Sequence, residues 1–379
     1  MIIPRTAGPE HRSFDLRDAI VFSTWDWDAF NVPERISLAL SMLGSRILYC
    51  AMPVSRFRNK PAVVDEVETG IDVFQPEYLG RKFSEFGLTR DWQWKKVAHQ
   101  IMKKSEALQL KDPVFIYSHV QHMLPLCAEM KAQGLPLIHI CMDYPEPWQY
   151  ELISISDRTL VIPNSVFHKL KARFGEKIEQ IPQSIHLPYA ATHSSAADSE
   201  SCEVASIPHP RLGYLGPVFG RLNIPLIRSV LNSHPEWQFL CFGVTNELKS
   251  LPNVHSLPWQ KPRELSGYVA SFDVGLMPYD CFTEKNLHCS PLKLFDYFFA
   301  GLPVVSTPVI PLWEFRDLIY FGDTAEEFSC AIRRALEESP QSPLRQKRVE
   351  VAHGHSTEAL ARRLQELCIN FDAQPRSVN

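Results

Sequence analysis

The chain has 379 residues, of which 45% are hydrophobic and 22% charged, a composition typical of a globular protein with room for two domains. The formal net charge of −4 gives no reason to expect binding to nucleic acid. The nine cysteines form no C-x-x-C pair, so reduced thiols are expected rather than disulfides or a zinc site. The sequence shows neither a signal peptide nor an apolar run of about 18 residues, which predicts a cytoplasmic protein, at most peripheral at the inner face of a membrane.

Short apolar runs alternate with amphipathic stretches in the N-terminal half. This pattern predicts a helix at residues 34–43 and buried strands at 19–23, 46–50, 114–117, 137–141 and 158–162. Strands separated by helices favour parallel pairing with right-handed crossovers. Residues 1–187 are therefore expected to form a Rossmann-like, acceptor-binding domain.

The first loops of this domain hold three polar or aromatic candidates for binding an acceptor. Trp27 and Asp28 enter the loop after the first predicted strand, and His119 follows a later one. Stacking on a sugar and packing within the loop both fit Trp27, and a single histidine at a strand end is often a structural hydrogen-bonding residue.

Residues 81–104 form a basic segment in a protein whose total charge is negative. They include seven lysine or arginine residues and two acids, with Phe83, Phe86, Trp92 and Trp94 interleaved. This composition suits docking on an anionic membrane surface, for which a lipid-linked acceptor would give a reason. A solvated helix whose aromatic side chains face the core explains the segment equally well.

The segment LPLIHICMDYPEPW predicts a strand that ends near Asp143, because Pro145 and Pro147 force the chain out of regular structure. At the carboxyl end of a parallel strand, Asp143 would face a cleft and could take the proton of an attacking hydroxyl. The alternative is that Asp143 caps the following turn.

The α/β rhythm stops at residues 188–210, which are rich in Ser and Ala and predict an exposed linker. It resumes with helices predicted at 224–232 and 291–300 and strands at 212–215, 237–242, 254–257, 274–277 and 303–306. Residues 211–355 are therefore expected to form a second Rossmann-like domain. Residues 356–379 are expected to hold a C-terminal helix that packs back on the first domain.

The run HCSPLKLFDYFFAGLPVV predicts a helix with Ser290 as N-cap and Pro291 as its first residue, so that Lys293 lies in the first turn. Free backbone N–H groups and the Lys293 charge would together neutralise a diphosphate. An ordinary capped helix is the alternative.

Two further segments of this half could contact a nucleotide. In GYLGPVFGR, a strand is followed by a turn in which Gly216 would let a phosphate approach the backbone and Arg221 could reach the same anion. Trp259 and Tyr279 also follow predicted strands and could pack on a base. Packing in the core or at an interface fits both aromatic residues as well.

In this order, these segments resemble the GT-B glycosyltransferases of bacterial polysaccharide assembly. NVHSLPWQKPRELSGYVASFDVGLMPYD and SPLKLFDYFFAGLPVVSTP look like the donor half of such enzymes. STWDWDAFNVPERISLALSMLGSRILYC is similar to the opening of teichuronic-acid-type transferases, and KLFDYFFAGLP matches a run of xanthan-type glucuronosyltransferases. The resemblance implies an α/β protein of two Rossmann-like domains, with parallel sheets facing across a cleft. It also implies transfer of a sugar from a UDP-sugar to a hydroxyl of a glycan or lipid-linked acceptor.

The resemblance assigns roles to residues of the second domain. It implies that Ser290 and Lys293 bind the donor diphosphate, that Trp259 and Tyr279 lie near the nucleoside, and that Asp296 lies near the donor ribose or sugar. The nucleotide sugar is a co-substrate, and neither a cofactor nor a metal is expected.

Retaining enzymes of this fold carry two glutamates eight positions apart, where this chain has His288 and Asp296. The resemblance therefore favours an inverting mechanism with Asp143 as the base, as in the xanthan-type enzymes. The alternatives are a nucleotide-sugar 2-epimerase of the same fold and a non-catalytic nucleotide-sugar-binding homologue. The presence of both Asp143 and Lys293 argues against the latter.

Overall fold

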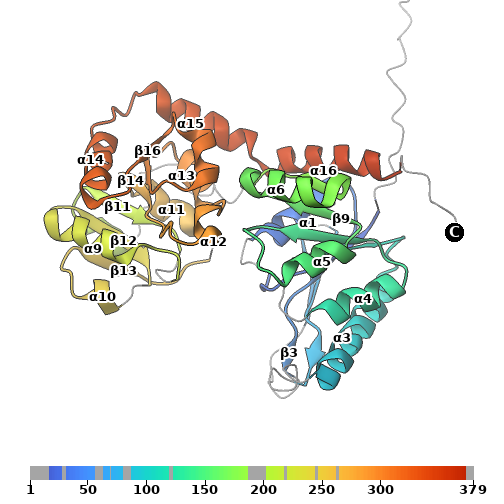
Figure 1. The fold of residues 1–379 in the computed structure, drawn as a ribbon. Helices are drawn as coiled ribbons and strands as arrows, with labels where there is room; N and C mark the ends of the chain where they lie inside the picture. The colour runs from blue at the N-terminus through green and yellow to red at the C-terminus, as the bar shows by residue number, and fades with distance from the viewer. Residues whose placement is uncertain are drawn as a thin grey trace, which may run out of the picture.

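The protein folds into two α/β domains, seen side by side in the computed structural model (Figure 1). The structure describes residues 17–27, 31–55, 63–68, 70–79, 87–118, 123–186, 202–216, 220–243, 246–261 and 264–372. Within these ranges, none of the helices has both the length and the apolar character needed to span a bilayer.

The N-terminal domain is built on an eight-stranded sheet with the order β10-β9-β8-β7-β1-β2-β5-β4. Neighbouring strands are parallel except β4 and β5, which are antiparallel. The strands are β1 (Ala19–Phe22), β2 (Ile47–Cys50), β4 (Val63–Glu68), β5 (Ile71–Phe74), β7 (Val114–Ser118), β8 (Leu137–Cys141), β9 (Arg158–Val161) and β10 (Ile178–Gln180). A separate parallel pair consists of β3 (Val54–Ser55) and β6 (Glu77–Tyr78).

Helices cover both faces of this sheet, which explains why β1 is apolar at every position. Ala19 and Val21 belong to the cluster formed with α1 and α16, whereas Ile20 and Phe22 pack with α3 and α4 on the opposite face. The helices of this layer are α1 (Val32–Met42), α3 (Gly87–Ala107), α4 (Leu124–Ala132), α5 (Gln149–Ile155), α6 (Asn164–Phe174), the short 3₁₀ turn η1 (Gly175–Lys177) and, from the end of the chain, α16 (Thr357–Asp372).

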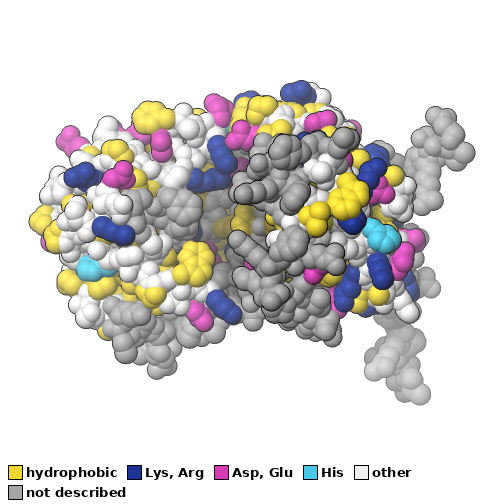
Figure 2. Space-filling view, turned by 90° about the horizontal axis from the view of Figure 1, so that it is seen from below, with side chains coloured by type: hydrophobic (Ala, Val, Ile, Leu, Met, Phe, Trp, Pro, Cys, Tyr) yellow, Lys and Arg dark blue, Asp and Glu magenta, His cyan; other side chains and the backbone are white. Residues whose placement is uncertain are grey.

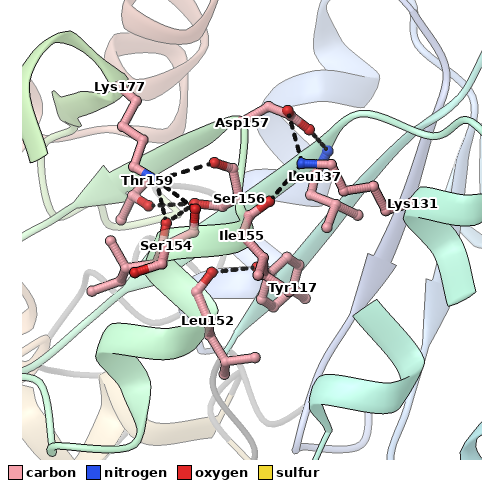
Figure 3. Close-up of polar contacts among 11 residues, drawn as sticks. Tyr117, Lys131, Leu137, Leu152, Ser154, Ile155, Ser156, Asp157, Thr159 and Lys177 are labelled. Atoms are coloured by element: carbon pink, nitrogen blue, oxygen red, sulfur yellow. Dashed lines mark hydrogen bonds and ion pairs between the residues drawn. The ribbon is translucent and has the colours of Figure 1, made fainter. Parts of the chain in front are cut away.

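A network of hydrogen bonds lies at the end of this sheet where β8 and β9 begin (Figure 3). The Lys177 ammonium donates to the carbonyls of Ile153, Ser154 and Ser156 at 2.6, 2.9 and 3.3 Å, and so satisfies the C-terminal end of α5. The Asp157 carboxylate accepts from the Leu137 amide at 2.8 Å, which ties the two strands together.

The C-terminal domain has a six-stranded parallel sheet with the order β13-β12-β11-β14-β15-β16. Its strands are β11 (Arg211–Tyr214), β12 (Gln238–Phe242), β13 (Val254–Leu257), β14 (Val274–Met277), β15 (Val304–Ser306) and β16 (Ile319–Phe321). Its helices are α8 (Cys202–Ala205), α9 (Ile224–Ser233), α10 (Asn246–Lys249), α11 (Leu265–Ala270), α12 (Glu284–Leu287), α13 (Lys293–Phe299), the 3₁₀ helix η3 (Ile310–Phe315), α14 (Ala325–Leu336) and α15 (Pro343–Gly354).

Outside the cleft, the structure differs from the sequence prediction in its strands, in the linker and at the start of a helix. No prediction covered residues 54–78, where β3 to β6 lie. The expected linker 188–210 falls partly outside the described residues, and its end is not exposed: Val204 and Ile207 are buried in the core of the C-terminal domain. Helix α1 begins at Val32, two residues before the predicted start.

Candidate active site

A cleft of about 780 Å³ lies between the two domains, within the size range of small-molecule sites. Loops that follow strands of both sheets contribute to its walls. From the N-terminal domain it is lined by Trp25, Trp27, Asn31, Val32, Arg35, Met142, Asp143, Gln183 and His186. From the C-terminal domain it is lined by Tyr214, Leu215, Gly216, Arg221, Phe242, Trp259, Gln260, Lys261, Leu265, Ser266, Val269, Tyr279, Ser290, Pro291, Leu292, Lys293, Asp296, Phe299 and Ala300.

The charges of these lining residues favour an anionic ligand. Four lysine or arginine side chains line the cleft against two carboxylates, although the whole protein is acidic. A diphosphate would balance the excess positive charge.

Lys293 is the first residue of α13, and two tyrosines hold its ammonium group. Its Nζ donates to the hydroxyl of Tyr279 at 2.9 Å and to that of Tyr214 at 3.2 Å, and it stands 4.4 Å from the centre of the Tyr214 ring. An ammonium group has three donors. Two are used in these contacts, and the third has no partner among the described residues, so it can meet a ligand in the cleft.

The predicted capping by Ser290 is wrong. Helix α13 begins at Lys293, with Leu292 as N-cap and no side-chain cap bond. The carbonyl of Ser290 instead accepts from Gln183 Nε2 of the other domain at 2.9 Å. With only seven residues, α13 adds little through its dipole, so the side-chain charges of Lys293 and its neighbours dominate this wall.

Arg221 and Gly216 both lie in the loop that follows β11. Gly216 has a φ of +116°, a backbone conformation that glycine adopts without strain. The Arg221 carbonyl accepts from the Asp280 amide at 2.9 Å, so this loop is tied to the loop that carries Tyr279.

Asp143 lies two residues after β8, where the sequence predicts it, and its carboxylate is paired with Arg221. Arg221 Nη2 donates to Asp143 Oδ2 at 2.7 Å, and Nη1 donates to Oδ1 at 3.2 Å. Burial alone would lower the pKa of Arg221, but the hydrogen bonds and charge of Asp143 outweigh burial and raise it. The predicted base and a predicted phosphate ligand thus neutralise each other across the cleft.

Asp296 lines the cleft from α13 and lies near a cationic side chain of the other domain. Burial raises the pKa of Asp296, and the charges of Arg35 and Lys293 oppose that rise. Arg35 projects from α1, and burial lowers its pKa to about 10. A second pair of opposite charges therefore faces across the domain boundary.

The two aromatic candidates for the nucleoside occupy different surroundings. Trp259 is 72% exposed at the mouth of the cleft, whereas Tyr279 is buried beside Lys293. Tyr279 thus positions the lysine, and Trp259 remains the accessible aromatic surface. The same domain also lines the cleft with the apolar side chains of Phe242, Leu265, Val269 and Phe299.

Of the three predicted acceptor residues, only Trp27 is described. It lines the cleft, its ring stands edge-on to Tyr49 at 5.0 Å, and its buried indole N–H has no hydrogen-bond partner among the described residues. Asp28 and His119 lie outside the described residues.

Asn31 is a cleft residue that the sequence analysis missed. It is the N-cap of α1 but makes no side-chain cap bond, and its amide is buried beside the Tyr49 hydroxyl, without a well-aligned hydrogen bond to any described residue. An Asn directly before a helix that begins Val-Pro-Glu could have drawn attention to it. A side-chain amide in this state suits a sugar hydroxyl, which both donates and accepts.

His288, where retaining enzymes carry their first glutamate, is not among the lining residues of the cleft. Its Nδ1 lies 2.8 Å from Ser165 Oγ, and its ring stacks on Tyr144 at 5.2 Å, so it joins the two domains beside the cleft. Among the described residues, no group of three His, Cys, Asp or Glu side chains is arranged to hold a metal ion.

Outside the cleft, α3 presents a basic face. Lys95, Lys96, His99 and Lys103 are exposed on it, and Trp92 is 45% exposed beneath the Lys96 ammonium. Trp94 instead packs edge-on against Phe22 in the core. Figure 2 looks at the molecule from below and shows hydrophobic, basic and histidine side chains together on the right, over the N-terminal domain, with some acidic side chains among them.

No family model matches the chain. The sequence is similar to a putative teichuronic acid biosynthesis glycosyltransferase of Bacillus subtilis, TuaH, with 28% identity over 165 residues. This match covers 40% of the chain and 41% of the relative, so it spans about two fifths of each protein. The predicted resemblance to this kind of glycosyltransferase is thereby confirmed.

Solved structures share the fold over nearly the whole chain. One described as trehalose-6-phosphate from E. coli bound with UDP-2-fluoro glucose has a TM-score of 0.67 at 11% identity and covers 93% of this chain and 98% of that one. Sucrose-phosphate synthase from Thermosynechococcus elongatus has a TM-score of 0.67 at 14% identity, covering 94% and 100%. A trehalose-6-phosphate synthase studied for glycosyl transfer with retention has a TM-score of 0.62 at 12% identity, covering 93% and 99%. The predicted GT-B fold, with two Rossmann-like domains and parallel sheets, is confirmed.

Proposed function

We propose that this protein is a glycosyltransferase that moves a sugar from a nucleoside-diphosphate sugar, most simply a UDP-sugar, to a hydroxyl of a glycan or lipid-linked acceptor. One observation carries the proposal: Lys293 and Arg221 of one domain and Asp143 of the other line the same cleft. Cations for a leaving diphosphate therefore stand opposite a carboxylate that can accept a proton.

The donor half of the proposal rests on the C-terminal domain. The diphosphate contacts the ammonium of Lys293, which Tyr214 and Tyr279 hold in place. The nucleobase of the donor packs on Trp259 and on the apolar side chains that line the same wall of the cleft. Asp296 and Asn31 line the same cleft and form hydrogen bonds with hydroxyls of the donor sugar or ribose.

The chemistry is a single in-line displacement. The acceptor oxygen forms a bond to the anomeric carbon while the bond from that carbon to the diphosphate oxygen breaks. Asp143 takes the acceptor proton, and Lys293 stabilises the charge on the departing nucleoside diphosphate. The product then has the opposite anomeric configuration from the donor.

Inversion sets this proposal apart from the trehalose-6-phosphate synthase studied for retention, whose likeness to this chain concerns the fold. Two observations support inversion here. His288 stands in place of the first glutamate and turns to Ser165 and Tyr144. Asp143 lines the cleft from the N-terminal domain, to which we assign the acceptor.

The test is turnover with the best nucleotide-sugar donor and an accepting glycan. Asp143→Asn should lower kcat about 10²- to 10⁴-fold, the usual contribution of a general base. Glu146→Gln, an exposed carboxyl in the same loop, is the matched control and should leave kcat unchanged. Near-normal turnover of Asp143→Asn, or an NMR spectrum of the product with retained configuration, would remove Asp143 as the base.

The basic face of α3 supports a membrane surface as the place where the protein meets its acceptor. Its lysines and Trp92 give a positively charged, amphipathic surface on an acidic protein, which suits an anionic membrane that presents a lipid-linked acceptor. The protein docks there through Lys95, Lys96 and Lys103, peripherally and at the inner face.

Sedimentation with vesicles tests this surface. Wild type should bind phosphatidylcholine vesicles that contain phosphatidylglycerol, and release as salt rises. Reversal of Lys95 and Lys96 to Glu should abolish binding, whereas reversal of the exposed Lys249 and Lys347 should not. Equal binding of all three proteins, or of wild type to neutral vesicles, would contradict the proposal.

A further inference from the structure

The contact between Arg221 and Asp143 joins the two domains at the centre of the proposed chemistry. The guanidinium makes a two-point contact, at 2.7 and 3.2 Å, with both carboxylate oxygens. The Arg221 side chain is 34% exposed and that of Asp143 22%, so the pair remains open to the cleft.

This pairing competes with proton transfer to Asp143. A base must direct a lone pair at the proton that it takes. Both Asp143 oxygens accept a hydrogen bond from a guanidinium that stays charged, so each oxygen has only its second lone pair left for the proton of an acceptor hydroxyl. In the structure, Arg221 therefore holds the Asp143 carboxylate in place and competes with an acceptor hydroxyl for its oxygens.

A diphosphate in the cleft would offer Arg221 a competing partner. Lys293 Nζ contacts the Tyr279 hydroxyl at 2.9 Å, and the loop of Arg221 is joined to the Tyr279 loop by the bridge between Leu222 and Tyr279. Arg221, Asp143 and Lys293 all line the same cleft. Phosphate oxygens accept two parallel guanidinium hydrogen bonds, as a carboxylate does, and carry more negative charge.

We infer that Arg221 blocks Asp143 until the nucleotide-sugar donor binds, a role that we call the guard. Without donor, the guanidinium occupies the carboxylate; when the donor diphosphate arrives beside Lys293, Arg221 transfers its two hydrogen bonds to it and frees Asp143. Arg221 is then a positioning residue that makes the base available only when the sugar to be transferred is present. This inference rests on the proposed function, because it requires a nucleoside-diphosphate ligand in the cleft.

A double-mutant cycle measured by UDP calorimetry tests the exchange. Asp143→Asn should bind UDP about three- to tenfold more tightly than wild type, because Arg221 no longer has to leave a carboxylate. Arg221→Ala should bind UDP more weakly, and adding Asp143→Asn to it should have no further effect. If Arg221→Ala does not fold, Arg221→Lys replaces it, and the gain from Asp143→Asn should shrink because lysine cannot make the two-point contact.

The cycle includes a control for loosening of the domain contact. Lys169 and Glu284 form another pair between the domains, at 3.8 Å and more than half exposed. Glu284→Gln removes the same amount of charge from that contact and should bind UDP as wild type does. A matching gain in Glu284→Gln would assign the effect to domain opening and overturn the guard.

The remaining outcomes separate the guard from the proposed function. Equal UDP affinity of wild type and Asp143→Asn overturns the guard and leaves donor binding intact. An undiminished gain in the Arg221→Ala background would indicate plain charge repulsion by Asp143 and also overturns the guard. If wild type binds none of UDP, GDP and dTDP, the proposed function fails, and the guard fails with it.

Discussion

Two arginine–carboxylate pairs in this protein have the same chemistry in different surroundings. Arg348 contacts Glu338 at 2.6 and 2.8 Å, and its Nε donates to the Leu318 carbonyl at 3.0 Å, all within the C-terminal domain. Its side chain is fully buried, whereas that of Arg221, paired with Asp143 across the cleft, is 34% exposed. A pair sealed inside one domain can only hold the fold, but a pair that a ligand can reach between two domains can be exchanged.

The polar network around Lys177 is also structural, although it lies at the surface, where the Lys131 and Asp157 side chains are 49% and 44% exposed. It lies at the sheet edge where β8 and β9 begin, whereas Asp143 follows the opposite end of β8 (Figure 3). The two ends of one strand therefore carry a structural network and a proposed catalytic group. This agrees with the rule that open α/β sheets bind ligands at the carboxyl ends of their strands.

The largest effect that we expect on stability comes from breaking the sealed pair. Arg348→Met leaves Glu338 buried and uncompensated, and should lower the free energy of unfolding by about 3–5 kcal/mol. The change is measured by urea denaturation. Arg348→Met combined with Glu338→Leu should recover most of the loss, and the exposed Arg333→Met should stay within about 0.5 kcal/mol of wild type. A similar loss in Arg221→Met would erase the distinction between the two pairs.

A smaller effect should follow from Lys177→Met. This change leaves three carbonyls at the end of α5 without their cationic donor and should cost about 1–2 kcal/mol of unfolding free energy. Denaturation of the exposed Lys249→Met provides the reference value. No difference between the two variants would mean that water replaces the Lys177 contacts without loss.

The smallest expected effect on the free energy of unfolding is its pH dependence through His288, which contacts Ser165 and Tyr144. Burial lowers the pKa of His288, and the nearby Lys169 lowers it further, while Glu284 raises it. The unfolded chain therefore binds a proton more readily than the folded one, so this contribution to stability is present above the ordinary pKa near 6.5 and is lost as the pH falls.

Unfolding of wild type and His288→Gln at pH 7.5 and 5.5 measures this contribution. Wild type should lose more stability than the variant on acidification, because only wild type carries an imidazole whose pKa the fold lowers. A larger loss in His288→Gln would reverse the sign and show that the charged imidazole is the one favoured by the fold.

The sequence predicted those parts of the site that depend on local order. Apolar runs identified β8, and the two prolines after it marked the end of the strand at which Asp143 stands. Trp94, Val97, Ala98 and Ile101 recur at three- and four-residue spacing, which is typical of the buried face of a helix. The same pattern leaves Trp92 off this face and so predicts that Trp92, and not Trp94, is exposed.

Other features depend on how the two domains meet and have no local signal. Asp143 and Arg221 are 78 positions apart, and nothing in either segment indicates that they form a pair. Ser290 has the chemistry of an N-cap, but its carbonyl is held by Gln183 of the other domain and the helix begins later. Tertiary contacts outweighed the capping preference at this position.

Calorimetry with UDP tests most directly whether the cleft holds a nucleotide-sugar donor. We expect wild type to bind UDP and Lys293→Ala to bind it about 10- to 150-fold more weakly, since a charged hydrogen bond is worth about 1.5–3 kcal/mol. Lys285→Ala, an exposed lysine of the same domain, should bind as wild type does. Equal affinity of wild type and a folded Lys293→Ala would contradict the assignment of this cleft to the donor diphosphate.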